Sequence, residues 1–148
     1  MKYISHSATE TENIGRMLGK ILPAGTVIAL FGDLGAGKTC FTRGFCSGMG
    51  IDTDVYSPTF AIVNEYRGNS KILYHFDMYR VSGFEDLYST AYFDYLDTDA
   101  SLIIEWSENI ESVLPEDCVR IMINKSDTDE NERIIEIIGC EDFENIIG

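Results

Sequence analysis

The sequence predicts a single α/β domain, residues 1–148, with a mixed, mostly parallel central sheet flanked by helices. Two patterns predict this fold class. Runs of apolar, β-branched residues, typical of strands buried on both faces, alternate with segments whose apolar residues recur at helical spacing. A glycine-rich turn also joins one such run directly to a helix. The chain of 148 residues, 45% hydrophobic and 24% charged, is long enough to bury one core without disulfide bonds.

The first half of the chain predicts two helices, a buried strand and a hairpin. Residues 7–10 have the form of a capping box, and the apolar residues after them share one helical face until residues 23–25 end the helix. The run 26–31 predicts the buried strand, and a second helix follows at about 38–49. Alternation predicts strands at 60–67 and 71–77, and the Gly68-Asn69-Ser70 turn indicates an antiparallel hairpin.

The second half predicts one helix and three strands. We expect the helix at 84–96, a buried strand at 102–105, and strands at 119–124 and 133–139 joined by the acidic, turn-rich residues 126–132. Phe143, Ile146 and Ile147 are spaced as in a short final helix.

Acidic residues are concentrated in this second half. Residues 1–84 carry eight basic and seven acidic side chains, whereas residues 85–148 carry three and eighteen. Such a negative field repels phosphate backbones, because nucleic-acid affinity comes largely from cations that neutralise phosphates. We therefore expect any anionic ligand to bind the first half, and no independent binding of nucleic acid.

The sequence argues against membrane, secreted and zinc-finger classes. No apolar run approaches the roughly 18 residues of a membrane span, and the first residues lack the apolar stretch of a secretory signal. Cys40, Cys46, Cys118 and Cys140 form no C-x-x-C pair. We expect reduced core cysteines, no zinc and a cytoplasmic protein.

The strongest motif is Gly32-Asp33-Leu34-Gly35-Ala36-Gly37-Lys38-Thr39, which satisfies G-x-x-x-x-G-K-[ST] between a predicted strand and a predicted helix. Glycines let successive backbone N–H groups point at one place, where they form an anion site with the N-terminus of the helix. Lys38 supplies a charge for the β- and γ-phosphates, and the Thr39 hydroxyl can ligate Mg²⁺. The sequence therefore predicts a P-loop NTPase-like fold that binds a nucleoside triphosphate.

Two carboxylates could complete this site. Such enzymes need an acid at the end of a neighbouring buried strand, to hold or orient the magnesium shell. Glu105 ends the strand 102–105, and Asp77 ends the strand 71–77, where His75 and Asp77 share one face. Periodicity ranks neither acid above the other, and His75 alone is typical of a structural histidine.

A second motif favours a different nucleotide. Asn124-Lys125-Ser126-Asp127 matches the N-K-x-D of guanine recognition and follows a predicted strand. GTPases also carry D-x-x-G, and the corresponding stretch here, Asp77-Met78-Tyr79-Arg80, lacks the glycine. A short polar run between two strands also arises as an ordinary turn, which we favour.

The motifs together resemble one family. Their order and spacing are similar to those of the TsaE (formerly YjeE) family. The motifs are the P-loop in the form GDLGAGKT, then Thr42-Arg43-Gly44, Ser57-Pro58-Thr59-Phe60, Tyr74-His75-Phe76-Asp77-Met78-Tyr79-Arg80 and Ile104-Glu105-Trp106. These are bacterial ATPases of tRNA threonylcarbamoyladenosine biosynthesis. The resemblance runs from about Ser7 to Gly139, and Cys40 departs from it where the family often has a second threonine.

The resemblance implies ATP and Mg²⁺ as ligands. It implies that Thr39 and Glu105 hold the metal and that Asp77, with Lys38, acts at the reacting end, orienting the attacking water or the water shell of the metal. Thr59 would face the γ-phosphate, Ala8 would lie where the chain passes the base, and Arg133 would lie near the nucleotide. The residues expected to bind the nucleotide are then Ala8, Leu34, Gly35, Ala36, Gly37, Lys38, Thr39, Thr59 and Arg133.

The resemblance also implies partners. Such proteins dock on the TsaB and TsaD transferase assembly, support its turnover by ATP hydrolysis, and reach tRNA only through it. Two other functions remain open, a small-molecule P-loop kinase and a nucleotide-gated binding module without hydrolysis. A kinase normally has arginines in a mobile lid, whereas Arg120 and Arg133, the only arginines after Arg80, lie in no lid-like insert.

Overall fold

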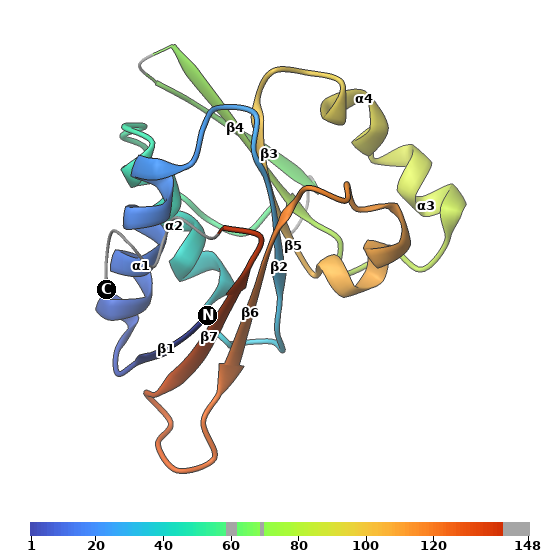
Figure 1. Cartoon of the computed structure of the whole chain (residues 1–148). Helices are drawn as coiled ribbons and strands as arrows, with labels where there is room; N and C mark the ends of the chain where they lie inside the picture. The colour runs from blue at the N-terminus through green and yellow to red at the C-terminus, as the bar shows by residue number, and fades with distance from the viewer. Residues whose placement is uncertain (59–61, 69, 141–148) are drawn as a thin grey trace.

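The computed structural model describes residues 1–58, 62–68 and 70–140. Their strands form one seven-stranded sheet in the order β1-β7-β6-β2-β5-β4-β3, with helices on both faces (Figure 1). The strands are β1 (Lys2–Ser5), β2 (Val27–Phe31), β3 (Val63–Gly68), β4 (Lys71–Asp77), β5 (Ser101–Glu105), β6 (Val119–Lys125) and β7 (Arg133–Ile138). The helices are α1 (Ala8–Ile21), α2 (Lys38–Gly48), α3 (Phe84–Ser89), α4 (Tyr92–Leu96) and the 3₁₀ segment η1 (Ser107–Val113).

The centre of the sheet is parallel and its edges are antiparallel. Strand β2 pairs in parallel with both β5 and β6, and β4 pairs in parallel with β5. The pairs β1–β7, β6–β7 and β3–β4 are antiparallel, which confirms the hairpin. The predicted α/β class with a mixed sheet is therefore confirmed, and the parallel centre brings the carboxyl ends of β2, β4 and β5 to one edge.

Each face of the sheet buries its own core. Ile28, Leu30 and Ile103 point to the side of α1 and α2, whereas Ala29 and Ile104 point to the side of α3, α4 and η1. Alternation along β2 and β5 explains this division, because successive side chains of a strand point to opposite faces. The apolar runs of β2 (residues 27–31) and β5 (residues 102–104) are continuous because both faces of these strands are covered.

Helix α1 begins at a side-chain cap. The Ser7 hydroxyl accepts a hydrogen bond from Glu10 N at 3.1 Å, as the capping-box pattern predicts. The reciprocal bond differs from that pattern, because the Glu10 carboxylate accepts from His6 N at 2.6 Å instead of Ser7 N. Both bonds satisfy backbone donors that lie outside the helical ladder.

Helices α1 and α2 pack backbone to backbone through four glycines. A Cβ on Gly15 would lie 2.3 Å from Phe41 O, and one on Gly19 would lie 2.2 Å from Phe45 O. From the other side, a Cβ on Gly44 would lie 1.8 Å from Glu12 O, and one on Gly48 would lie 2.1 Å from Arg16 O. No larger residue fits at these positions without moving a helix, so the close approach of the two helix backbones depends on glycine at all four positions.

Three features of the second half and the N-terminus differ from the sequence prediction. The continuous helix over 84–96 is wrong, because Ala91 adopts a left-handed backbone (φ 60°) that separates α3 from α4. Strand β1 and segment η1 were not predicted, since four residues and a short 3₁₀ segment that is kinked at Ile110 carry too little periodicity. Phe60, Asn69 and the proposed helix around Phe143, Ile146 and Ile147 lie outside the described residues.

Within the described part of the chain, no helix combines the length and the apolar character that a bilayer crossing requires.

Candidate nucleotide site

The glycine-rich loop 32–37 joins β2 to α2 at the carboxyl edge of the sheet. Gly37 caps α2 with a left-handed backbone (φ 113°), which a side chain would strain. Gly32 passes so close to β6 that a Cβ would lie 2.4 Å from Ile123 O. Glu108 of η1 accepts a hydrogen bond from Gly32 N at 3.1 Å, so the loop is also held from the opposite face of the sheet.

Lys38 is the first residue of α2, and its side chain extends back to the start of this loop. Its Nζ donates to Gly32 O and, at 3.1 Å, to Asp33 O, and it lies 3.8 Å from the centroid of the Trp106 ring. The side chain is buried, and burial lowers the pKa of Lys38, although the nearby acids, Glu105 first among them, oppose this effect. The amine is therefore a partly desolvated charge, which attracts an anion more strongly than a charge in water does.

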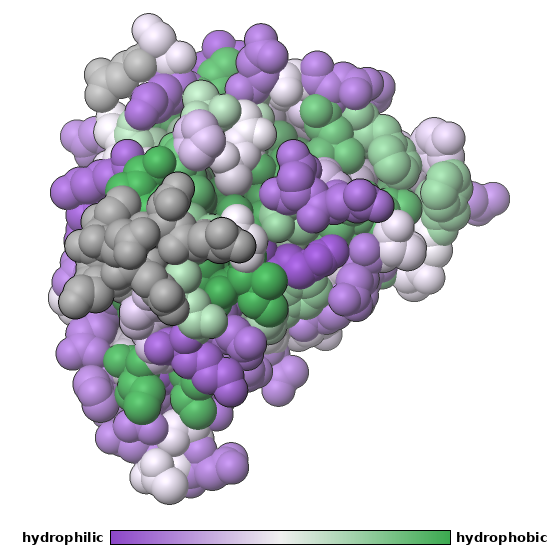
Figure 2. Space-filling view, in the orientation of Figure 1, coloured by the Kyte–Doolittle hydropathy of each residue, from purple (hydrophilic) through white to green (hydrophobic). Residues whose placement is uncertain are grey.

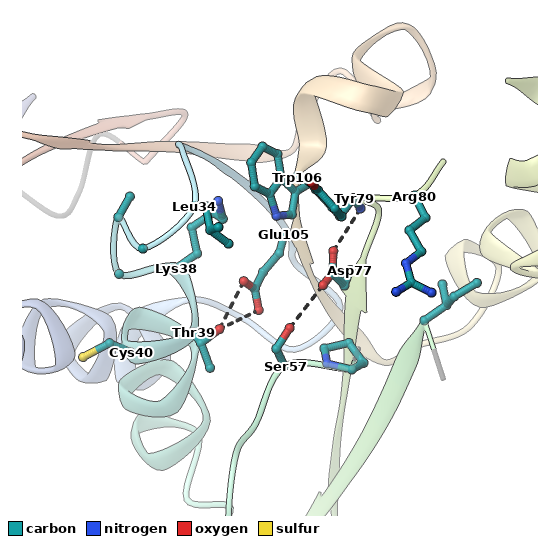
Figure 3. A pocket seen from close by; sticks show the side chains of 15 residues that line it. Leu34, Lys38, Thr39, Cys40, Ser57, Asp77, Tyr79, Arg80, Glu105 and Trp106 are labelled. Atoms are coloured by element: carbon teal, nitrogen blue, oxygen red, sulfur yellow. Dashed lines mark hydrogen bonds between the residues drawn. The ribbon is translucent and has the colours of Figure 1, made fainter. Parts of the chain in front are cut away.

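Opposite Lys38, two acids from neighbouring strands face the same cavity (Figure 3). Asp77 of β4 and Glu105 of β5 are register partners, and both line a cavity of about 520 Å³ together with residues 34–40. The Thr39 hydroxyl lies 3.2 Å from each Glu105 carboxylate oxygen. Ser57 Oγ donates to Asp77 Oδ2 at 3.1 Å, and Tyr79 N donates to Asp77 Oδ1 at 2.9 Å.

This oxygen set fits a magnesium ion. Mg²⁺ prefers hard oxygen ligands, and in nucleotide sites it is held by one or two protein oxygens, with phosphates and waters completing the shell. Thr39 Oγ1 and the Glu105 carboxylate converge in that way. Among the described residues, no group of three or more His, Cys, Asp or Glu side chains could hold a metal ion by itself.

A smaller hollow, of about 120 Å³, adjoins the loop on the α1 side. Ala8 and Arg133 line it together with Ala36, Gly37 and Cys40. Arg133 Nε donates to Ala36 O at 2.8 Å, and the Cys40 thiol lies 3.1 Å from Ala8 O. The first helix and the last described strand, far apart in the sequence, therefore meet beside the phosphate loop.

The structure brings most of the residues predicted for the site to two adjoining hollows. The smaller hollow is lined by Ala8 and Arg133. The larger one is lined by Leu34, Gly35, Ala36, Gly37, Lys38, Thr39, Asp77 and Glu105. Thr59 lies outside the described residues. What these residues bind stays a prediction.

The contacts that come from η1 and from the β3–β4 hairpin were not predicted from the sequence. Glu108 reaches the loop although 76 positions separate it from Gly32, and no local pattern marks it. The buried His75 contacts Glu105 through Nε2, so it does more than pack. Lys125 of the N-K-x-D stretch also lies beside the loop, with Nζ 3.3 Å from where a Cβ on Gly35 would be.

Comparison with known proteins gives consistent matches. The family model described as "Threonylcarbamoyl adenosine biosynthesis protein TsaE" matches residues 5–135. A tRNA threonylcarbamoyladenosine biosynthesis protein TsaE from Bacillus subtilis is 38% identical over 140 residues, 94% of this chain and 87% of its own length. The TsaE protein of Treponema pallidum is 38% identical over 123 residues, 83% of this chain and 90% of its own length.

A solved structure has the same fold. The crystal structure of Bacillus subtilis YdiB aligns with a TM-score of 0.77 and 31% identity, covering 99% of this chain and 90% of that chain. The likeness therefore extends over the whole sheet and its helices and is not confined to the phosphate loop.

Proposed function

Because the chain belongs to the TsaE family, whose role is in tRNA threonylcarbamoyladenosine biosynthesis, we propose that it is an ATPase of that process and takes ATP with Mg²⁺ in the cavity of about 520 Å³. One observation carries the proposal. The buried Lys38 amine, the Thr39 hydroxyl and the acids Asp77 and Glu105 face one cavity at the N-terminus of α2. A phosphate group and a divalent cation are the ligands that this combination of charges suits.

The proposed roles follow from where each side chain lies. Lys38 and the backbone N–H groups of residues 34–39 bind the phosphates, and Thr39 with Glu105 holds the metal. Asp77 keeps both of its oxygens in hydrogen bonds to Ser57 and Tyr79, so its carboxylate is fixed in direction. We assign it to the orientation of a water at the reacting end. The bound metal would supply charge neutralisation on the phosphates.

The base is proposed to lie in the hollow lined by Ala8 and Arg133, and adenine is its proposed identity. The alternative is a guanine site built on Asn124–Asp127, because Lys125 lies beside Gly35 of the loop. A small-molecule kinase is less well supported, because Arg120 and Arg133 lie in strands β6 and β7 and neither forms part of a lid.

The proposed partners are the TsaB and TsaD proteins, with tRNA reached only through them. An acidic, partly aromatic face supports a protein partner. Residues 81–119, which contain α3, α4 and η1, include nine exposed acidic side chains, besides the buried Glu105, and no lysine or arginine. Phe84 and Tyr88 on this face are 59% and 64% exposed, and Figure 2 shows hydrophobic residues among hydrophilic ones near α3. Such a surface steers basic protein surfaces and repels nucleic acid.

The test begins with the isolated protein. Phosphate release from ATP should depend on Mg²⁺ and should be lost in Lys38→Ala, whose fold should remain intact by circular dichroism. Trp106 is the only tryptophan of the chain and lies against Lys38, so nucleotide binding should change its fluorescence. Hydrolysis in Lys38→Ala at the wild-type rate would contradict the assignment.

Two further measurements test the partner and the role. The protein should co-elute with the TsaB–TsaD pair in ATP and Mg²⁺ and should not bind tRNA alone at physiological salt. In a reconstituted mixture it should raise the yield of modified adenosine over many cycles, and Lys38→Ala should remove this gain. Tight binding of tRNA by the isolated chain, or no association with the pair under any nucleotide condition, would refute the partner assignment. Transfer of phosphate to an added acceptor would favour the kinase.

A further inference from the structure

We propose that Tyr66 and His75 are positioning residues, which hold the Glu105 carboxylate in the orientation that binds magnesium. The inference rests on the proposed function, because it concerns the metal that accompanies the nucleotide. Neither side chain lines the cavity, so both would act through Glu105.

A buried chain of polar contacts links three adjacent strands. Tyr66 of β3 places its hydroxyl 3.1 Å from His75 Nδ1, and His75 Nε2, on the other side of the ring, contacts Glu105 Oε2. His75 of β4 is fully buried, and Glu105 of β5 is only 4% exposed. Glu105 in turn lies 3.2 Å from the Thr39 hydroxyl at the start of α2. The chain therefore runs from the edge of the sheet to the metal site.

The donor and acceptor capacities of these side chains determine where the protons lie along this chain of contacts. A carboxylate only accepts, so His75 must carry its proton on Nε2 to donate to Glu105. In a neutral ring, Nδ1 is then an acceptor, and the Tyr66 hydroxyl is the donor facing it. The single Tyr66 proton has two acceptors at 3.1 Å, His75 Nδ1 and Tyr56 O. Tyr56 O also accepts from Asn64 Nδ2 at 3.0 Å, so it keeps a donor when the Tyr66 hydroxyl donates to His75. Tyr66 therefore selects the tautomer of His75 that holds Glu105.

This arrangement restricts the carboxylate. With Oε2 fixed by His75, rotation of Glu105 is limited, and Oε1 remains available beside Thr39. Partners that hydrogen-bond a metal ligand are worth roughly 10- to 100-fold in metal affinity when they are removed. The alternative is that the chain only satisfies buried polar groups, in which case it affects stability and leaves magnesium affinity unchanged.

Two tyrosine-to-phenylalanine variants of the protein form a matched pair. Tyr66→Phe removes the hydroxyl that faces His75. Tyr92→Phe removes a hydroxyl from another buried tyrosine, which donates to Val113 O at 3.2 Å on the opposite face of the sheet. Calorimetric titration of Mg²⁺ into protein saturated with a slowly hydrolysed ATP analogue measures metal affinity, and titration of the analogue in EDTA measures nucleotide affinity without metal.

We expect Tyr66→Phe to weaken magnesium affinity by about 10-fold, with nucleotide affinity in EDTA within about twofold of wild type. Tyr92→Phe should change neither affinity. In a Glu105→Gln background, Tyr66→Phe should have no further effect on magnesium, because a residue that acts through Glu105 cannot act without it. Unchanged magnesium affinity in Tyr66→Phe, an equal loss in Tyr92→Phe, or an undiminished effect in the Glu105→Gln background would each overturn the inference.

Two histidine variants decide the matter if Tyr66→Phe does not fold. His75→Gln retains an amide donor on a flexible chain, whereas His75→Leu retains none. We expect His75→Gln to bind magnesium more tightly than His75→Leu, and equal affinities would overturn the inference. If Mg²⁺ does not change the affinity of the wild-type protein for the analogue, the proposed metal site is overturned as well. If Glu105→Gln loses the effect of Mg²⁺ and the Tyr66 and His75 variants keep it, only this inference is overturned.

Discussion

Gly44→Ala tests the close contact between α1 and α2. The new Cβ would lie 1.8 Å from Glu12 O, and ordinary van der Waals contact begins at 3.4 Å, so the two helices must separate by about 1.6 Å. Overpacking of this kind costs about 3 kcal/mol or slightly more. Alanine is favoured over glycine within a helix by about 1 kcal/mol, which offsets part of that cost. We expect a net loss of about 2 kcal/mol in the free energy of unfolding.

Urea unfolding followed by circular dichroism measures this loss. For a domain of this size the expected loss lowers the urea midpoint by about 1 M, if the slope is about 2 kcal/mol per molar. Gly83→Ala is the control, because nothing lies within 4 Å of its Cβ position and its backbone is extended. The control should lose less than about 1 kcal/mol, the most that a change of helix cap implies here. A Gly44→Ala midpoint at or above the wild-type value would refute the packing argument.

Three further variants test the site and the first helix. Asp77→Asn should leave ATP affinity unchanged and slow phosphate release by about 10-fold or more, since it alters charge at the reacting end and hardly alters size; normal hydrolysis would make Asp77 an ordinary strand end. Asp127→Ala should retain a preference for ATP over GTP in competition binding, and a collapse of nucleotide affinity would revive the guanine site. Ser7→Ala should lower the free energy of unfolding by about 1 kcal/mol, because Glu10 N loses its cap, and an unchanged urea midpoint would show that the cap is redundant.

Local patterns in the sequence were sufficient to predict the loop and the central strands. The glycines of 32–37 and the apolar runs of β2 and β5 each specify their own conformation within about ten residues, and the structure confirms those elements. The break at Ala91 was not predictable in this way. Alanine favours helices, so the left-handed backbone of Ala91, next to the buried Tyr92, does not follow from local propensity.

The acids of the site were predictable as strand ends, but their partners were not. Asp77 and Glu105 became candidates because each closes a buried run, and register then places them side by side. The contact of His75 with Glu105 joins positions 30 residues apart, and that of Glu108 with Gly32 joins positions 76 apart. Contacts of this kind depend on strand order, which single-sequence periodicity does not encode.

Because Ser5 of β1 pairs with Arg133 of β7, β1 cannot join the sheet until Arg133 has been synthesised. The nascent chain can form α1, β2 and α2 much earlier, since their contacts are local and loop closure among them costs little entropy. Arg133, which donates to the carbonyl of Ala36, arrives only with β7. The hollow beside Ala8 is therefore assembled late in synthesis, and until then the phosphate loop lacks one of the side chains that support it.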